Sequence, residues 1–257
     1  MRLHVHEFGP SLGRTVVALH GVTSSGLAFR RLAARLPDLH LVCPDLRGHG
    51  ASTGDPPWDL SVHVRDVRET CDRLGIAQAP FIGFSLGGRI AVELLAAERF
   101  RVERLVLMEP TLQLDPTRAL AAADELLTDT SFATIEEAIE ARIASGIAPY
   151  APREHWERWS EQLVTGADGR LRLPYSRPAA IALYGEMTTA PPPFDRLRTP
   201  TVLIVGAESQ LVTAKQRERY KYDLGDYLEI VTVRAKHSLI ADAADEVAAA
   251  IKSFLAR

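Results

Sequence analysis

The stretch Pro80-Phe81-Ile82-Gly83-Phe84-Ser85-Leu86-Gly87-Gly88-Arg89-Ile90 joins an apolar run to a helix-like segment through a G-x-S-x-G motif. A serine in such a strand-to-helix turn adopts a strained backbone conformation, which exposes its hydroxyl at the carboxyl edge of a sheet. Gly83 and Gly87 carry no Cβ, so the strand and the helix can approach closely. The start of that helix adds free N–H groups and a positive dipole end. This stretch predicts an α/β fold with Ser85 as a candidate nucleophile.

Short apolar runs alternate with helix-period segments on both sides of this motif. The alternation predicts an α/β fold with a mostly parallel twisted sheet flanked by helices. The runs are continuous in Val, Ile and Leu, which is typical of strands buried on both faces. The predicted strands are Leu3–Phe8, Thr15–Leu19, Leu39–Cys43, Phe81–Phe84, Val102–Met108, Thr201–Val205 and Tyr227–Val233. The predicted helices lie near 26–36, 60–74, 86–98, 213–223 and 243–256.

One segment interrupts the alternation, from about residue 111 to residue 193. It is rich in Ala, Glu, Arg and Leu and shows no convincing strand. A length of about 80 residues is too great for a loop. We therefore expect 111–193 to form a helical cap inserted into a core domain of residues 1–110 and 194–257. The alternative is that its helices pack directly on the faces of the sheet. These helices are predicted near 116–128, 134–145, 152–164 and 176–187.

Composition excludes several classes of protein. The chain has 257 residues and a formal net charge of −3, with 25% charged residues, as in ordinary globular proteins. It has no basic run that would bind nucleic acid. No apolar stretch approaches the roughly 18 residues that cross a bilayer, and the N-terminus shows no signal-peptide pattern. The two cysteines, Cys43 and Cys71, do not suggest a disulfide framework. We expect a cytoplasmic protein without nucleic-acid or membrane partners.

Three further motifs accompany the serine motif. They are His20-Gly21, Asp45-Leu46-Arg47-Gly48-His49-Gly50-Ala51-Ser52 and Lys236-His237-Ser238-Leu239, and each follows a predicted strand. In this order they resemble the α/β-hydrolase superfamily, most closely its small, capped, esterase-like members. The resemblance covers the whole chain except the predicted cap and implies the α/β-hydrolase fold. It says little about substrate, because this fold hosts many chemistries. It also implies that Asp45 and Arg47 hold the turn after their strand.

The general base follows from chemistry and chain order. A serine hydroxyl needs a base to take its proton, and histidine is the usual one because its pKa lies near neutrality. Of the eight histidines, His237 lies after the last predicted strand and downstream of Ser85. That is the place that the order serine, acid, histidine requires. The histidines and cysteines form no metal-ligand motif, so we expect no metal and no cofactor.

The acid of the triad is harder to place. The resemblance puts it in the loop Gly206-Ala207-Glu208-Ser209-Gln210-Leu211-Val212, but the usual aspartate position holds Ser209. Glu208 is the one carboxylate of that loop. Some family members carry the acid at the end of the strand after the nucleophile helix, where this chain has Glu109. A carboxylate buried there without a partner would be costly, and an imidazolium would be such a partner. We expect Glu109 to be the acid, with Glu208 as the alternative and acids such as Asp242 still open.

An oxyanion hole and a pocket complete the expected site. The resemblance implies two backbone N–H donors, from Leu86 after the nucleophile and from Val22 after His20-Gly21. The loop lacks the H-G-G-G form, which lowers the expectation of bulky tertiary-alcohol esters. Aromatic residues of the cap are candidates for substrate binding, with core packing as the alternative. They are Trp156, Trp159 and Tyr184.

These residues predict a serine hydrolase that cleaves carboxylic esters of small soluble substrates through an acyl-enzyme on Ser85, with His237 as base. The alternatives are a lactonase or a C–C bond hydrolase on the same triad, and a non-catalytic small-molecule receptor or binding protein. Serine at position 85 argues against haloalkane dehalogenases and epoxide hydrolases, because both resemblances call for aspartate there. The expected partner is a small-molecule ester or lactone, and the oligomeric state is left open.

Overall fold

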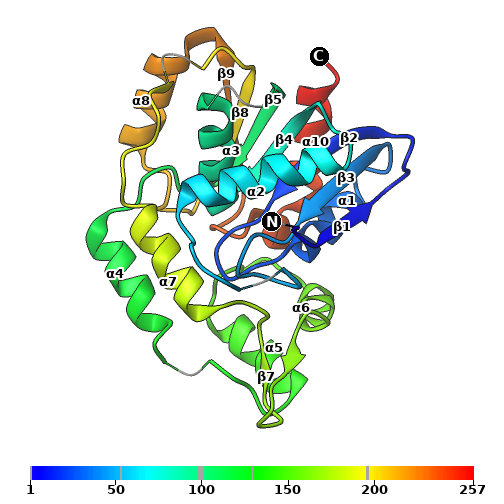
Figure 1. Cartoon of the computed structure of the whole chain (residues 1–257), viewed down its shortest axis with the longest axis vertical. Helices are drawn as coiled ribbons and strands as arrows, with labels where there is room; N and C mark the ends of the chain where they lie inside the picture. The colour runs from blue at the N-terminus through cyan, green and yellow to red at the C-terminus, as the bar shows by residue number, and fades with distance from the viewer. Residues whose placement is uncertain (1, 53, 98–100, 129, 195–196) are drawn as a thin grey trace.

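A seven-stranded sheet forms the centre of the molecule. The computed structural model describes residues 2–52, 54–97, 101–128, 130–194 and 197–257 (Figure 1). The strand order is β1-β3-β2-β4-β5-β8-β9, and all neighbours pair in parallel except β1 and β3. The sheet consists of β1 (Val5–Phe8), β2 (Arg14–Leu19), β3 (Leu39–Pro44), β4 (Gln78–Phe84), β5 (Arg101–Met108), β8 (Thr201–Gly206) and β9 (Leu228–Val233). All seven predicted strands and the α/β-hydrolase architecture are confirmed.

The continuous apolar runs arise because the sheet is covered on both faces. Successive side chains of a strand point to opposite faces, so each run serves two cores. In β2, Val17 and Leu19 lie in one core, whereas Val16 and Ala18 lie in the other. All four side chains are almost completely buried. A strictly alternating strand could not pack against helices on both sides.

Helices cover the two faces. The first core packs α2 (Leu60–Arg73), α3 (Leu86–Ala96) and α8 (Ala214–Leu224) on the sheet. The second packs η1 (Gly26–Phe29), α1 (Arg30–Ala33), α9 (Leu239–Asp242) and α10 (Ala244–Leu255). Side chains cap several helices: Asp59 accepts from Val62 N–H at the start of α2, and Thr213 and Gln216 form a capping box on α8.

One predicted helix is shorter than expected. The segment near 26–36 forms the 3-10 turn η1 and the single turn α1, which ends at Ala33. Pro37 disfavours helical geometry in the residue before it, so the chain leaves the helix ahead of it. Leu36 is nevertheless fully buried, which explains the helix-like apolar pattern.

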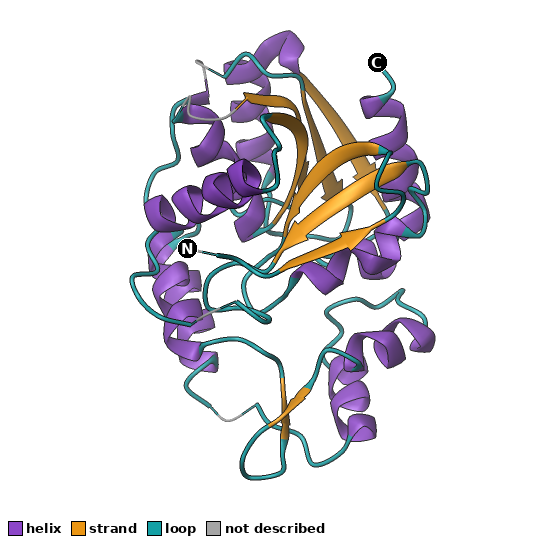
Figure 2. Cartoon of the chain, turned by 45° about the vertical axis from the view of Figure 1, so that its right-hand side comes forward, coloured by secondary structure: helices purple, strands orange, loops and turns teal. Residues whose placement is uncertain are grey.

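The 111–193 segment lies at one end of the sheet, below the arrowheads of the parallel strands in Figure 2. The expectation that it has no strand is wrong: β6 (Val164–Thr165) and β7 (Leu171–Arg172) form an antiparallel hairpin with two residues in each strand. Its turn contains Gly169 at φ +76°, a conformation that glycine adopts readily. The described part of the segment also contains four helices at the predicted places: α4 (Pro116–Glu125), α5 (Ile135–Ala144), α6 (Arg153–Ser160) and α7 (Arg177–Glu186). The division into core and cap stays a prediction.

Neither a spanning helix nor a disulfide is seen among the described residues. None of their helices has the length and apolarity to cross a membrane. Cys43 and Cys71 are separate buried thiols, and burial raises the pKa of Cys71 to about 12.

Three buried histidines lie close to one another beside the turn after β3. The rings of His20 and His49 are 5.3 Å apart, and His63 lies on α2. Burial lowers the pKa of His20 and His63 to about 4 and that of His49 to about 3. Within the described part of the chain, neither ring nitrogen of His63 has a hydrogen-bond partner. These histidines are therefore neutral in the folded protein at neutral pH.

We expect the free energy of unfolding to fall as the pH drops from 6.5 to 4. In that window the unfolded histidines bind protons that the folded ones do not, at about 1.4 kcal/mol per pH unit for each fully linked group. Above pH 7 this contribution is constant. Urea unfolding at pH 7, 6, 5 and 4.5 measures the slope, and His63→Leu should make it shallower. Equal slopes in the two proteins would remove His63 from this linkage.

Candidate active site

Ser85 lies in the sharp turn between β4 and α3. Its backbone has φ 52° and ψ −116°, a strained region for a residue with a side chain. The turn requires glycine on both sides. A Cβ on Gly83 would lie 2.5 Å from Gly88 Cα, and one on Gly87 would lie 2.0 Å from the carbonyl oxygen of Leu19. The close approach that the motif predicts is present.

Gly87→Ala is expected to destabilise the protein by about 3 kcal/mol or more, because the backbone of Leu19 must move to admit the methyl group. Urea unfolding measures the loss. Gly185→Ala is the matched control: its Cβ would meet nothing within 4 Å in helix α7, so it should be neutral or slightly stabilising. Equal stability of Gly87→Ala and the wild type would contradict the packing described here.

Thr111 is a neighbour of Ser85 that sequence reasoning missed. The Ser85 and Thr111 hydroxyl oxygens are 3.1 Å apart, and Thr111 N–H donates to the Ser85 carbonyl over 3.1 Å. Thr111 is buried. Within the described residues Ser85 forms no hydrogen bond with His237, so Thr111 holds the hydroxyl in this state. Nothing in the sequence near Thr111 distinguishes it from an ordinary loop residue.

Glu109 follows the last residue of β5 and is completely buried. Its backbone has a positive φ of 43°, which is rare for a glutamate and turns the chain at the strand end. Gly206 N–H donates to Oε1 over 2.8 Å, and the Ser209 hydroxyl donates to Oε2 over 2.6 Å. Oε2 also lies 3.6 Å from His237 Nδ1. The usual aspartate position thus holds a serine that binds the carboxylate from the neighbouring strand.

The other candidate acids are engaged elsewhere. Glu208 accepts a hydrogen bond from the Tyr150 hydroxyl. Asp242 accepts from the backbone N–H groups of Tyr150 and Lys236, over 2.8 and 3.0 Å. Among the described residues, Glu109 is the one carboxylate in contact with His237.

His237 lies in the loop between β9 and α9, and its side chain is one-third exposed. Its ring stacks on Phe84, with ring centres 4.9 Å apart. Nδ1 is buried and has no hydrogen-bond partner among the described residues, so Glu109 is its polar neighbour. A carboxylate beside Nδ1 leaves Nε2 to face a substrate or nucleophile.

The two candidate oxyanion donors flank the turn of Ser85. Leu86 is the first residue of α3. Val22 follows Gly21, whose added Cβ would lie only 3.1 Å from Ser85 Cβ. As far as the chain is described, neither Val22 N–H nor Leu86 N–H donates a hydrogen bond. Thr23 has a positive φ of 61°, so this loop is strained beside the serine.

A cavity of about 820 Å³ opens beside Ser85 and His237, which both line it. The helices of the 111–193 segment form its far wall. Trp156 also packs in a small core with Ile139, and its role in substrate binding stays a prediction. The three candidate aromatic residues all line the cavity: Trp156, Trp159 and Tyr184.

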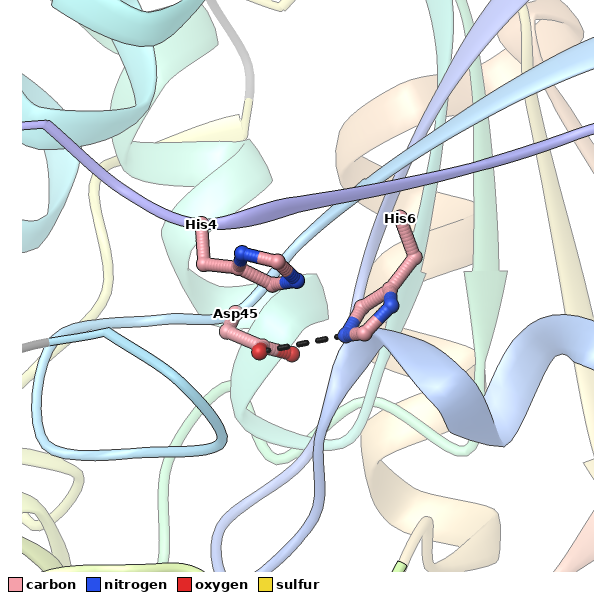
Figure 3. A group of neighbouring side chains, drawn as sticks. All are labelled: His4, His6 and Asp45. Carbon is pink, nitrogen blue, oxygen red and sulfur yellow. Dashed lines mark hydrogen bonds and ion pairs between the residues drawn. The ribbon is translucent and has the colours of Figure 1, made fainter.

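The turn after β3 has a supporting role. Figure 3 shows His6 directed at Asp45, with Nε2 3.1 Å from Oδ2. Gly26 N–H and Ala51 N–H also donate to the two oxygens of Asp45. His4, His6 and Asp45 are the one group among the described residues whose ligand-type atoms lie close enough for a metal ion. Since Asp45 already accepts three hydrogen bonds, we interpret the group as a structural link between β1 and this turn.

Arg47 extends this network into α2 with two hydrogen bonds to Asp66, of 2.7 and 3.0 Å. It also donates to the carbonyl of Asp55. Two parallel bonds between a guanidinium and a carboxylate fix both side chains. The motif therefore holds the turn after β3 against α2, in agreement with the structural role that the resemblance implies.

Comparison with known proteins identifies the family. The pattern of the Alpha/beta hydrolase family matches residues 16–250. The chain belongs to the α/β-hydrolase family. Among curated proteins, Lipase LipV of Mycobacterium tuberculosis is 31% identical over 258 residues, which cover 98% of this chain and 97% of that protein. The 3-hydroxybutyrate-oligomer hydrolase of Cupriavidus necator is 26% identical over 230 residues, covering 82% and 78%.

The fold of this hydrolase has close structural counterparts. The crystal structure of E-2-(acetamidomethylene)succinate hydrolase matches with a TM-score of 0.86 and 24% identity, over 99% of this chain and 95% of that one. This likeness shows the shared fold. The family match and the relatives named as a lipase and an esterase place the chain among hydrolase enzymes.

Proposed function

We propose that this α/β hydrolase is a serine hydrolase that cleaves carboxylic esters of small soluble substrates. The observation that carries the proposal is the contact between the buried Glu109 carboxylate and His237 Nδ1, beside Ser85 on its strained turn. A nucleophile, a base and an orienting acid come from three separate strand ends. That is the arrangement that acyl transfer needs.

In the proposed reaction, Ser85 Oγ attacks the ester carbonyl while His237 Nε2 takes the hydroxyl proton. The tetrahedral intermediate collapses, the carbon–oxygen bond to the alcohol breaks, and His237 gives the proton to the leaving alcohol. Water then attacks the acyl-enzyme with the same histidine as base, which releases the carboxylic acid and restores Ser85. Glu109 orients the imidazole and stabilises its protonated form.

Backbone donors support the intermediate in this proposal. Val22 N–H and Leu86 N–H are free of other partners within the described chain and flank Ser85, so they can bind the developing oxyanion. One such donor contributes roughly 3–4 kcal/mol in well-studied hydrolases. In the resting arrangement the Ser85 hydroxyl bonds to Thr111, and it must turn toward His237 before attack.

Ester cleavage is favoured over the alternative reactions by the relatives, which are named as a lipase and as a hydrolase of 3-hydroxybutyrate oligomers. The non-catalytic binding protein was favoured by the missing loop aspartate. Glu109 supplies a carboxylate at His237 from another strand, so that argument loses its basis. We further propose that 111–193 acts as a cap whose aromatic residues contact the substrate.

Hydrolysis of p-nitrophenyl acetate, butyrate and octanoate tests the proposal. We expect turnover of at least the shorter esters, and the dependence on chain length reports how the 820 Å³ cavity is filled. Absence of turnover with all three esters would contradict a general ester hydrolase.

A further inference from the structure

Two half-buried arginines in the cavity wall have no hydrogen-bond partner for the side chain among the described residues. Arg31 comes from α1 and Arg142 from α5, and both line the cavity that contains Ser85. The Nε atom of each is buried without a hydrogen-bond partner, as far as the described residues extend. Neither side chain forms an ion pair with another described residue. A buried N–H donor without a partner is costly and calls for an explanation.

Charged groups of both signs surround Arg31. Arg35 and Arg158 lie near enough to lower its pKa, after the larger effect of burial. Two carboxylates are also near, but each is already bound. Asp245 accepts two hydrogen bonds from Arg35, of 2.7 and 3.2 Å, and Asp242 accepts from two backbone N–H groups. These carboxylates act on Arg31 from a distance, and among the described residues none forms an ion pair with it.

Arg142 is held in place without a carboxylate. Its guanidinium carbon lies 4.8 Å from the ring centre of Trp159, which also lines the cavity. Stacking on an aromatic face leaves the edge of the guanidinium free to donate hydrogen bonds. Burial lowers the pKa of Arg142, but a guanidinium keeps its charge at neutral pH. Arg142 thus lines the cavity with no hydrogen-bond partner for its guanidinium among the described residues.

Arg30 shows that arginines of the cavity wall do not all lack an ion-pair partner. Arg30, next to Arg31 in sequence, also lines the cavity but is paired with Glu161. Basic side chains outnumber acidic ones among the described lining residues. The cavity therefore carries positive charge. Arg31 and Arg142 are two of its lining arginines that form no ion pair with the described residues. A planar guanidinium matches a carboxylate, which can accept two of its hydrogen bonds.

We propose that the cavity binds an ester that itself carries a carboxylate group, with Arg31 and Arg142 as the anion-binding side chains. This inference rests on the proposed ester hydrolysis and adds a substrate class to it. In this proposal the two guanidinium groups bind the carboxylate of the substrate, and Trp159, which also lines the cavity, contacts its apolar chain.

Binding of glutarate, a dicarboxylate without an ester bond, tests the site independently of catalysis. Isothermal titration of the wild type should show binding at neutral pH, whereas neutral dimethyl glutarate should bind more weakly. Arg31→Met and Arg142→Met should each weaken glutarate binding about tenfold, the scale of one charge-assisted hydrogen bond. Arg142→Lys keeps the charge but loses the planar donors, so it should fall between wild type and Arg142→Met.

Arg30→Met is the matched control, because it removes one positive charge from the same wall but from an arginine already paired. It should change glutarate binding less than twofold. If it weakens binding as much as Arg142→Met, the effect is one of net charge and the proposed site is wrong. Absence of glutarate binding to the wild type, or unchanged binding by correctly folded Arg31→Met and Arg142→Met, overturns the proposal as well. Circular dichroism verifies folding.

Kinetics connects the site to the reaction. We expect p-nitrophenyl hydrogen glutarate to have a higher kcat/KM than its neutral methyl ester, and the two Arg variants to lose this preference through KM. Glutarate binding without hydrolysis of any ester would overturn the proposed function and leave the anion site standing. Ester hydrolysis without a preference for the anion and without glutarate binding would overturn the anion site and leave the proposed function standing.

Discussion

Ser85→Ala is expected to lower kcat for p-nitrophenyl butyrate by about 10⁴-fold to 10⁶-fold, the range found when serine nucleophiles of other hydrolases are removed. Alanine keeps the backbone of the turn but leaves no oxygen to form the acyl-enzyme. KM should change little, because the cavity wall is intact. The variant retains Gly83 and Gly87, so its stability should match that of the wild type.

Ser253→Ala is the control for this experiment. Ser253 is exposed on α10 at the other side of the second core, and its replacement should leave kcat unchanged. Steady-state rates of the wild type and the two variants, measured with one batch of substrate, test whether Ser85 is the nucleophile. If Ser85→Ala keeps more than a few per cent of the wild-type rate, Ser85 is not the nucleophile.

Glu109→Gln is expected to lower kcat by about 10³-fold to 10⁴-fold, as amide replacements of the triad acid do in other serine hydrolases. The amide has no charge to stabilise the imidazolium of His237. It also meets two donors, Gly206 N–H and the Ser209 hydroxyl, with a side chain that accepts through one oxygen only. We therefore expect a loss of stability of about 1–3 kcal/mol alongside the loss of rate.

Glu208→Gln is the matched control, with the same change of residue in the loop where the family usually carries its acid. Its carboxylate accepts from the Tyr150 hydroxyl, and an amide oxygen can do the same. Its kcat should stay within a few-fold of the wild type. A large loss in Glu208→Gln together with a small one in Glu109→Gln would assign the acid to the loop.

The sharp turn that contains Ser85 was predictable because its requirements are local. Gly83, Ser85 and Gly87 lie within five consecutive positions, and steric contact between adjacent elements demands glycine at 83 and 87. The same holds for the strands, whose apolar runs directly reflect burial on two faces. The hairpin β6–β7 was not predicted because strands of two residues are too short to show an alternating hydrophobic pattern.

The contacts that complete the candidate site could not be predicted from the sequence, because they join residues that are far apart in the chain. Ser209 and Glu109 are 100 positions apart, yet they share a hydrogen bond because β5 and β8 are neighbours in the sheet. Sequence reasoning placed Glu109 ahead of Glu208 because of its position at a strand end, but it left Glu208 open, since contact with His237 depends on the fold. Thr111 and Arg142 carried no signal at all, since their roles depend on what the fold places beside them.

By itself, the sequence determined the fold class, the strand order along the chain, and the identities of Ser85 and His237 as candidates, because backbone sterics and hydrophobic periodicity act between neighbours in the chain. The tertiary structure decided which carboxylate meets His237, which hydroxyl holds Ser85, and which arginines face the cavity without a partner. These are contacts between elements distant in sequence, and their energies depend on distances and burial that arise only when the sheet assembles.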